Sequence, residues 1–122
     1  MIFQRRPAVP SVGVAEAHER LAHPAGPRPL LLDVREPDEF VRVRADGAVL
    51  LPLGSLPVRW RDLPRDRPIL VICATGNRSA SATAYLLAAG FPDVANVDGG
   101  TVAWYRAGLP WRSGPPEPHE LG

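Results

Sequence analysis

The 122-residue sequence contains one cysteine, no lysine, no long apolar run and almost no net charge. A single cysteine excludes an internal disulfide, so we expect a fold that forms without covalent cross-links. A net charge of +1 leaves no basic excess for nucleic-acid phosphates or an anionic membrane surface, and we expect neither partner. No apolar run approaches the roughly 20 residues that span a bilayer, and residues 1–7 lack the apolar stretch of a secretory signal. We therefore expect a cytoplasmic protein.

Histidine is also scarce. His18, His23 and His119 are the only histidines and lack the spacing of metal ligands, so we expect no metal site. The share of apolar residues, 45% against 22% charged, favours a globular chain, and its length fits one domain. We divide the chain into an N-terminal extension at residues 1–8, a domain at 9–112 and a flexible, polar and proline-rich tail at 113–122.

Apolar runs and helical patterns alternate through the domain. Strands are expected at 30–34, 48–51, 69–72 and 94–97, with a short edge strand at 9–12. Helices are expected at 14–21, 36–40, 79–89 and 99–107, with short helical pieces around 53–60. Continuous apolar strands are typical of sheets covered on both faces, so the alternation predicts an α/β domain with a mainly parallel sheet. Ligands of such sheets bind at the carboxyl ends of strands, where Asp33 and Cys73 fall.

Cys73 lies between a strand and a helix, at the start of the loop Cys73-Ala74-Thr75-Gly76-Asn77-Arg78-Ser79. We expect its thiol to face main-chain N–H groups and the positive end of the helix dipole, which favour the thiolate. Gly76 permits the positive φ of a tight anion-binding turn, Arg78 supplies a cation for an anionic donor, and Ser79 is expected to cap the helix. Cys73 is therefore a candidate nucleophile. The alternative is that it is only a small buried hydrophobic residue at the end of a strand, but the glycine, asparagine, arginine and serine that follow it favour the nucleophile.

Carboxylates near the preceding strand have simpler interpretations. Asp33 is a candidate for orienting the loop from the neighbouring strand, but helix capping or pairing with Arg35 is the role that we favour. The acidic run from Glu36 to Glu39 is interpreted as a solvated helix start that the helix dipole favours.

The loop Cys73–Ser79 resembles the C-R-x-G-x-R-S active loop of rhodanese-like sulfurtransferases. The resemblance covers nearly all of residues 9–112, and its further motifs agree in order and spacing. These motifs are Leu32–Phe40, Gly47-Ala48 with Pro52-Leu53, and Asp98-Gly99-Gly100 with Ala103-Trp104. Two segments depart from the family pattern. Val43-Arg44-Ala45-Asp46-Gly47-Ala48 stands where G-H-I-P-G-A is common, and Ala74 stands where arginine commonly follows the cysteine. One cation fewer is expected to weaken the grip on a dianion and to shift donor preference away from thiosulfate.

The resemblance implies a five-stranded, mainly parallel sheet flanked by helices on both faces, and an enzyme of the thiosulfate sulfurtransferase type. Cys73 would take a sulfane sulfur from thiosulfate or a similar small donor, hold it as a persulfide and pass it to cyanide, glutathione or a protein thiol. Residues 74–79 would bind the donor and the persulfide, and no metal or organic cofactor would be needed. With no second cysteine in the chain, the acceptor must come from elsewhere.

Two other functions stay open at this point. One is a non-catalytic interaction or sensing module that keeps the fold, which the two departures support. The other is an arsenate reductase or a phosphatase, which is disfavoured because Cys73 and Arg78 have Cys-x4-Arg spacing, whereas the phosphatases that resemble this family use a Cys-x5-Arg loop. The lack of a resolving cysteine also speaks against an arsenate reductase.

Overall fold

Five parallel strands form the centre of the structure, a computed structural model that describes residues 7–122. Their order across the sheet is β1-β6-β5-β2-β4, and every pairing is parallel. In chain order they are β1 (Ser11–Val12), β2 (Leu30–Asp33), β4 (Ala48–Leu50), β5 (Ile69–Ile72) and β6 (Val94–Val97). Both β5 and β6 are buried along their whole length, as strands covered on two faces must be. The predicted fold class is confirmed.

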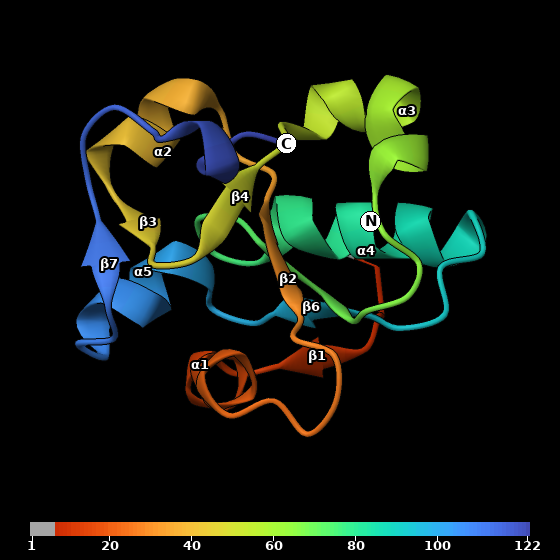
Figure 1. Cartoon of the computed structure of the whole chain (residues 1–122), viewed down its shortest axis with the longest axis horizontal. Coiled ribbons are helices and arrows are strands. Elements are labelled where there is room, and N and C mark those ends of the chain that lie inside the picture. The colour runs from red at the N-terminus through yellow and green to blue at the C-terminus, as the bar shows by residue number, and fades with distance from the viewer. Residues whose placement is uncertain (1–6) are drawn as a thin grey trace, which may run out of the picture.

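Helices cover both faces of this sheet. They are α1 (Val14–Ala22), α2 (Pro37–Arg42), α3 (Leu56–Arg59), α4 (Asn77–Ala88) and α5 (Gly100–Arg106), with short 3-10 helices η1 (Leu53–Ser55), η2 (Trp60–Asp62) and η3 (Pro118–Glu120). Figure 1 shows α1 and α5 on one side of the sheet and α3 and α4 on the other. Successive strand residues serve the two sides, so that Leu31 packs in one core cluster with Trp104, and Leu32 packs in the other with Leu86.

The carboxyl ends of β2 and β5 lie side by side, because Asp33 is in register with Ile72. This arrangement brings Asp33 and Cys73 to the same edge of the sheet, as the sequence predicted. The helices that follow β2, β5 and β6 all begin near this edge. The edge therefore collects three helix N-termini around one loop.

A second, two-stranded antiparallel sheet pairs β3 (Arg44–Ala45) with β7 (Trp111–Arg112). It was not predicted, since two residues are too few to show a strand pattern. The sheet joins the chain after α2 to the chain after α5.

The tail at residues 113–122 was predicted to be flexible, and the structure instead packs it on the domain. Gly114 donates its N–H to the Val41 carbonyl, and Gly122 donates to the Leu50 carbonyl, at 2.7 and 2.8 Å. Glu120 is buried and forms an ion pair with Arg44. The sequence could not show this, because the partner of the buried guanidinium lies far along the chain.

Residues 1–6 of the predicted N-terminal extension lie outside the described residues. Within residues 7–122, no helix is both long enough and apolar enough to cross a membrane.

Candidate active site

The Cys73 loop connects the end of β5 to the start of α4. Gly76 is the N-cap of α4 and has a φ of 109°, a left-handed conformation that strains any residue with a Cβ. The helix begins at Asn77, earlier than predicted, so that Ser79 lies inside its first turn. Ser79 makes no cap, which corrects the sequence-based expectation.

The start of α5 holds the loop from outside. The Cys73 carbonyl accepts the N–H and the hydroxyl of Thr101 at 2.8 and 3.0 Å, and the Ala74 carbonyl accepts the N–H of Val102 at 3.1 Å. This approach needs Gly100, because a Cβ there would lie 2.5 Å from both loop carbonyl oxygens. With its carbonyls turned toward α5, the loop can turn its N–H groups inward.

The sulfur of Cys73 lies at the floor of the loop, and the residue is 1% exposed. Its Sγ accepts the N–H of Gly76 at 3.1 Å and lies 3.2 Å from the Ser79 hydroxyl. Burial raises the pKa of the thiol. The Ser79 hydroxyl and the amides of Ser79, Gly76 and Thr75 lower it, and together they outweigh the effect of burial. The net pKa is below the ordinary cysteine value, so the expectation of a favoured thiolate is supported.

Ser79 links the sulfur to Asn96 on β6. Its hydroxyl donates to Asn96 Oδ1 at 2.5 Å, and both residues are completely buried. A hydroxyl has one hydrogen, so it cannot donate to Asn96 and to the sulfur together. In the thiol form Cys73 can donate to the hydroxyl oxygen, whereas the hydroxyl stabilises the thiolate only when its own hydrogen turns toward the sulfur. Rotation of the Asn96 amide would then supply an N–H to the Ser79 oxygen.

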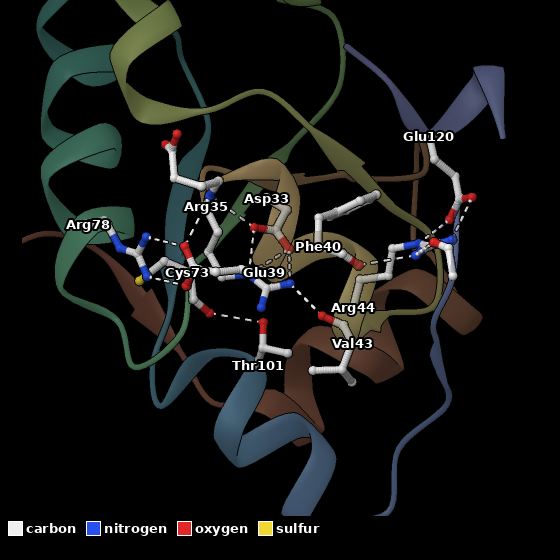
Figure 2. Close-up of polar contacts among 12 residues, drawn as sticks. Asp33, Arg35, Glu39, Phe40, Val43, Arg44, Cys73, Arg78, Thr101 and Glu120 are labelled. Atoms are coloured by element: carbon white, nitrogen blue, oxygen red, sulfur yellow. Dashed lines mark hydrogen bonds and ion pairs between the residues drawn. The ribbon is translucent and has the colours of Figure 1, made fainter. Parts of the chain in front are cut away.

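Arg78 is already paired. It donates two hydrogen bonds to Glu39 on α2, with Nη1–Oε1 at 2.7 Å and Nη2–Oε2 at 2.9 Å (Figure 2). This bidentate bond lowers the pKa of Glu39 to about 2 and raises the pKa of Arg78. The expectation of a free cation for the donor therefore needs correction, since Arg78 and Glu39 together carry no net charge.

Asp33 and Arg35 form a buried bidentate pair, with Arg35 Nη2 at 2.8 Å from Asp33 Oδ2 (Figure 2). Arg35 also donates to the Val43 carbonyl at 2.7 Å. Within residues 7–122, the hydrogen bonds to the Asp33 carboxylate all come from Arg35, so the favoured prediction, pairing with Arg35, is confirmed. The pair ties the end of β2 to the chain after α2.

The remaining predicted loop residues form the rim. Thr75 and Asn77 are exposed, Ala74 is half-buried, and only Gly76 and Ser79 are buried beside the sulfur. Within the part of the chain that the structure describes, no three His, Cys, Asp or Glu side chains gather closely enough to hold a metal ion. The site therefore offers a polarised thiol ringed by main-chain amides.

Glu39 and Asn96 are the site residues that sequence reasoning missed. Glu39 was interpreted as part of a solvated helix start, and its partner lies 39 positions away. Asn96 carried a usable signal, because it is the one polar side chain in the strand Val94–Val97. A buried amide requires hydrogen-bond partners, which such a position could have indicated.

The fold and the loop place the chain among known proteins. The model of the rhodanese-like domain matches residues 14–107, so the chain belongs to the rhodanese-like family. A sulfurtransferase of Allochromatium vinosum is 41% identical to the chain over 81 residues, which cover 66% of this chain and 76% of that protein. The family that the motifs indicated is thus confirmed.

Solved structures agree. The rhodanese-related protein of Thermoplasma volcanium is 33% identical with a TM-score of 0.76, and the match covers 84% of this chain and 97% of that one. The thiosulfate sulfurtransferase of Pseudomonas aeruginosa is 31% identical, also with a TM-score of 0.76. That match covers 87% of this chain but 20% of the other, which is much longer.

Proposed function

We propose that this protein is a sulfurtransferase that carries sulfane sulfur as a persulfide on Cys73. The observation that carries the proposal is the position of Sγ, which accepts the Gly76 N–H at the base of a loop that lowers the thiol pKa. A lowered pKa increases the share of thiolate at a given pH, and the thiolate is the nucleophilic form. The sulfurtransferase of Allochromatium vinosum, at 41% identity, supports this assignment.

In the first half-reaction the Cys73 thiolate attacks the outer sulfur of a donor such as thiosulfate. A bond forms between Sγ and that sulfur, the sulfur–sulfur bond of the donor breaks, and sulfite leaves with the electron pair. The negative charge moves from Sγ to the outer sulfur of the persulfide, where the loop amides and the dipole of α4 stabilise it.

In the second half-reaction an external nucleophile attacks the outer sulfur, and the Cys73 thiolate leaves. Cyanide, glutathione or a protein thiol would serve as the acceptor, because the chain has no second cysteine to take the sulfur. A cysteine that carries sulfur and has no disulfide partner in the chain fits a reducing compartment, which supports a cytoplasmic location.

The test is intact-mass measurement after incubation with thiosulfate, mercaptopyruvate or a persulfidated donor protein. We expect a gain of one sulfur atom in the wild type, lost on addition of cyanide with formation of thiocyanate. Cys73→Ser should show neither the mass gain nor thiocyanate above the uncatalysed rate. Equal thiocyanate production by both proteins would refute the mechanism, and a wild type that gains no sulfur from any donor would favour the non-catalytic interaction module.

A further inference from the structure

A cleft of about 190 Å³ opens beside the Cys73 loop, between the chain that follows α2 and the outer side of α5. Its uncharged lining residues are Val43, Ala74, Thr101, Val102 and Tyr105. Figure 2 shows the Thr101 hydroxyl against the Cys73 carbonyl and the Arg35 guanidinium against the Val43 carbonyl. The cleft is thus mainly apolar and adjoins the candidate active site.

The loop itself forms one wall of this cleft. Ala74 follows Cys73 directly, and the Thr101 hydroxyl donates to the Cys73 carbonyl at 3.0 Å. Val102 is bound through its N–H to the Ala74 carbonyl at 3.1 Å. Cys73 does not itself line the cleft, so a donor whose reacting sulfur lies at Sγ would have to extend past Ala74 to place its carbon framework there.

The charges around the cleft are of one sign. Arg35 and Arg106 are its only charged lining residues, and no carboxylate lines it. Arg35 is buried and neutralised by Asp33, whereas Arg106 is exposed at the end of α5. Within residues 7–122 the Arg106 side chain makes no ion pair, so a positive charge at the rim is available to an anion.

Both departures from the family pattern meet here. Val43 and Ala74 stand at the two places where the chain differs from the family's motifs, and both line the cleft. A long side chain at position 74 would extend into this space, whereas the methyl group of Ala74 leaves it open. An engineered apolar cavity of about 150 Å³ holds benzene, so a group of that size fits.

We propose that the cleft binds the organic group of a sulfur donor with an apolar, ring-sized body, and that Arg106 binds a carboxylate on that body. The inference rests on the proposed function and names its substrate class. It agrees with the charges at the loop, where Ala74 supplies no cation and Glu39 already holds Arg78. Such a site favours a donor whose reacting end carries a single negative charge, such as an organic thiosulfonate, over the thiosulfate dianion.

Organic thiosulfonates are suitable probes of this preference. The Cys73 thiolate attacks the outer sulfur of R–SO₂–S⁻, the sulfur–sulfur bond breaks, and the sulfinate R–SO₂⁻ leaves with the electron pair. The product is the same Cys73 persulfide for every R. Differences in kcat/KM between R groups then report on intrinsic reactivity and on the cleft, and a variant separates the two.

The experiment compares methanethiosulfonate, benzenethiosulfonate and 4-carboxybenzenethiosulfonate. Val102→Trp, a change at an exposed position of α5, should fill the cleft and lower the benzene-to-methane ratio of kcat/KM roughly tenfold. Arg106→Gln should lower the carboxybenzene-to-benzene ratio about threefold. Val58→Trp is the matched control, since Val58 is an exposed valine outside the cleft, and both ratios should stay at the wild-type values.

Binding is measured separately from turnover. Calorimetry with benzenesulfinate on Cys73→Ser should detect binding that Val102→Trp removes and Val58→Trp retains. Ratios and binding that Val102→Trp and Arg106→Gln leave unchanged, in a protein that still forms the persulfide, would overturn the cleft and spare the proposed function. Binding with these variant effects, but no persulfide from any donor, would support the cleft and overturn the sulfur transfer.

Discussion

Substitution of Glu120 by glutamine is expected to destabilise the protein strongly, although Glu120 lies in a segment with few apolar residues. Arg44 Nε is 2.7 Å from Glu120 Oε2, and its Nη2 is 3.1 Å from Oε1 (Figure 2). Arg44 is completely buried and Glu120 is 3% exposed. Removal of the carboxylate charge would leave the Arg44 guanidinium uncompensated in the interior, which is the costly way to break a buried pair.

Two independent arguments give the magnitude. The Arg44 hydrogen bonds lower the pKa of Glu120 from 4.5 to about 2, which corresponds to about 3 kcal/mol of folding free energy at neutral pH. Loss of one partner of a buried ion pair typically costs about 3 to 5 kcal/mol. For a chain of this length we expect Glu120→Gln to lower the melting temperature by roughly 10 °C.

The sign of the pH dependence is fixed by the lowered pKa. A carboxylate with a folded pKa below its unfolded value stabilises the fold above pH 4.5, and this contribution disappears as the pH falls toward 2. The difference in unfolding free energy between wild type and Glu120→Gln should therefore be about 3 kcal/mol at pH 7 and about 1 kcal/mol at pH 3. Urea titration at the two pH values measures both.

Asp62→Asn is the matched control. Arg59 Nε lies 2.7 Å from Asp62 Oδ2, the same separation as in the buried pair, but the two side chains are 42% and 62% exposed. Exposed pairs contribute about 0.2 to 1 kcal/mol, so this variant should lose much less stability. Equal losses from Glu120→Gln and Asp62→Asn would refute the argument that burial determines the strength of the Arg44 pair.

Two further predictions concern the candidate active site. Ser79→Ala should raise the pKa of Cys73, because the Ser79 hydroxyl is the strongest of the groups that lower it. The rate of iodoacetamide alkylation, measured as a function of pH, reports the shift. An unchanged pH profile of alkylation would show that Ser79 does not stabilise the thiolate. Glu39→Gln should lower KM for thiosulfate, because it frees Arg78. In the wild type the pKa of Glu39 is about 2, so KM should show no carboxylate titration between pH 5 and pH 8. An unchanged KM in the variant, or a transition in that pH range in the wild type, would contradict the pairing.

Local sequence determined the strands and the loop. The run at 69–72 is apolar throughout and the run at 94–97 is apolar except for Asn96, and a strand covered on both faces needs a mainly apolar composition. The positive φ at Gly76 favours a residue without a Cβ, and the sequence supplies one three positions after Cys73. These signals lie within a few residues of each other, so the fold class and the family could be predicted, and Cys73 could be proposed as the nucleophile.

Only the tertiary structure decided which polar side chains meet across long stretches of sequence. Glu39 reaches Arg78 across 39 positions, Glu120 reaches Arg44 across 76, and Asn96 reaches Ser79 across 17. The chain has fourteen basic and thirteen acidic residues, and composition does not say which of them pair. A charge selects its partner by burial and by geometry that the packed helices and sheet create, so the neutralised Arg78 and the packed tail emerge only when the whole chain is folded.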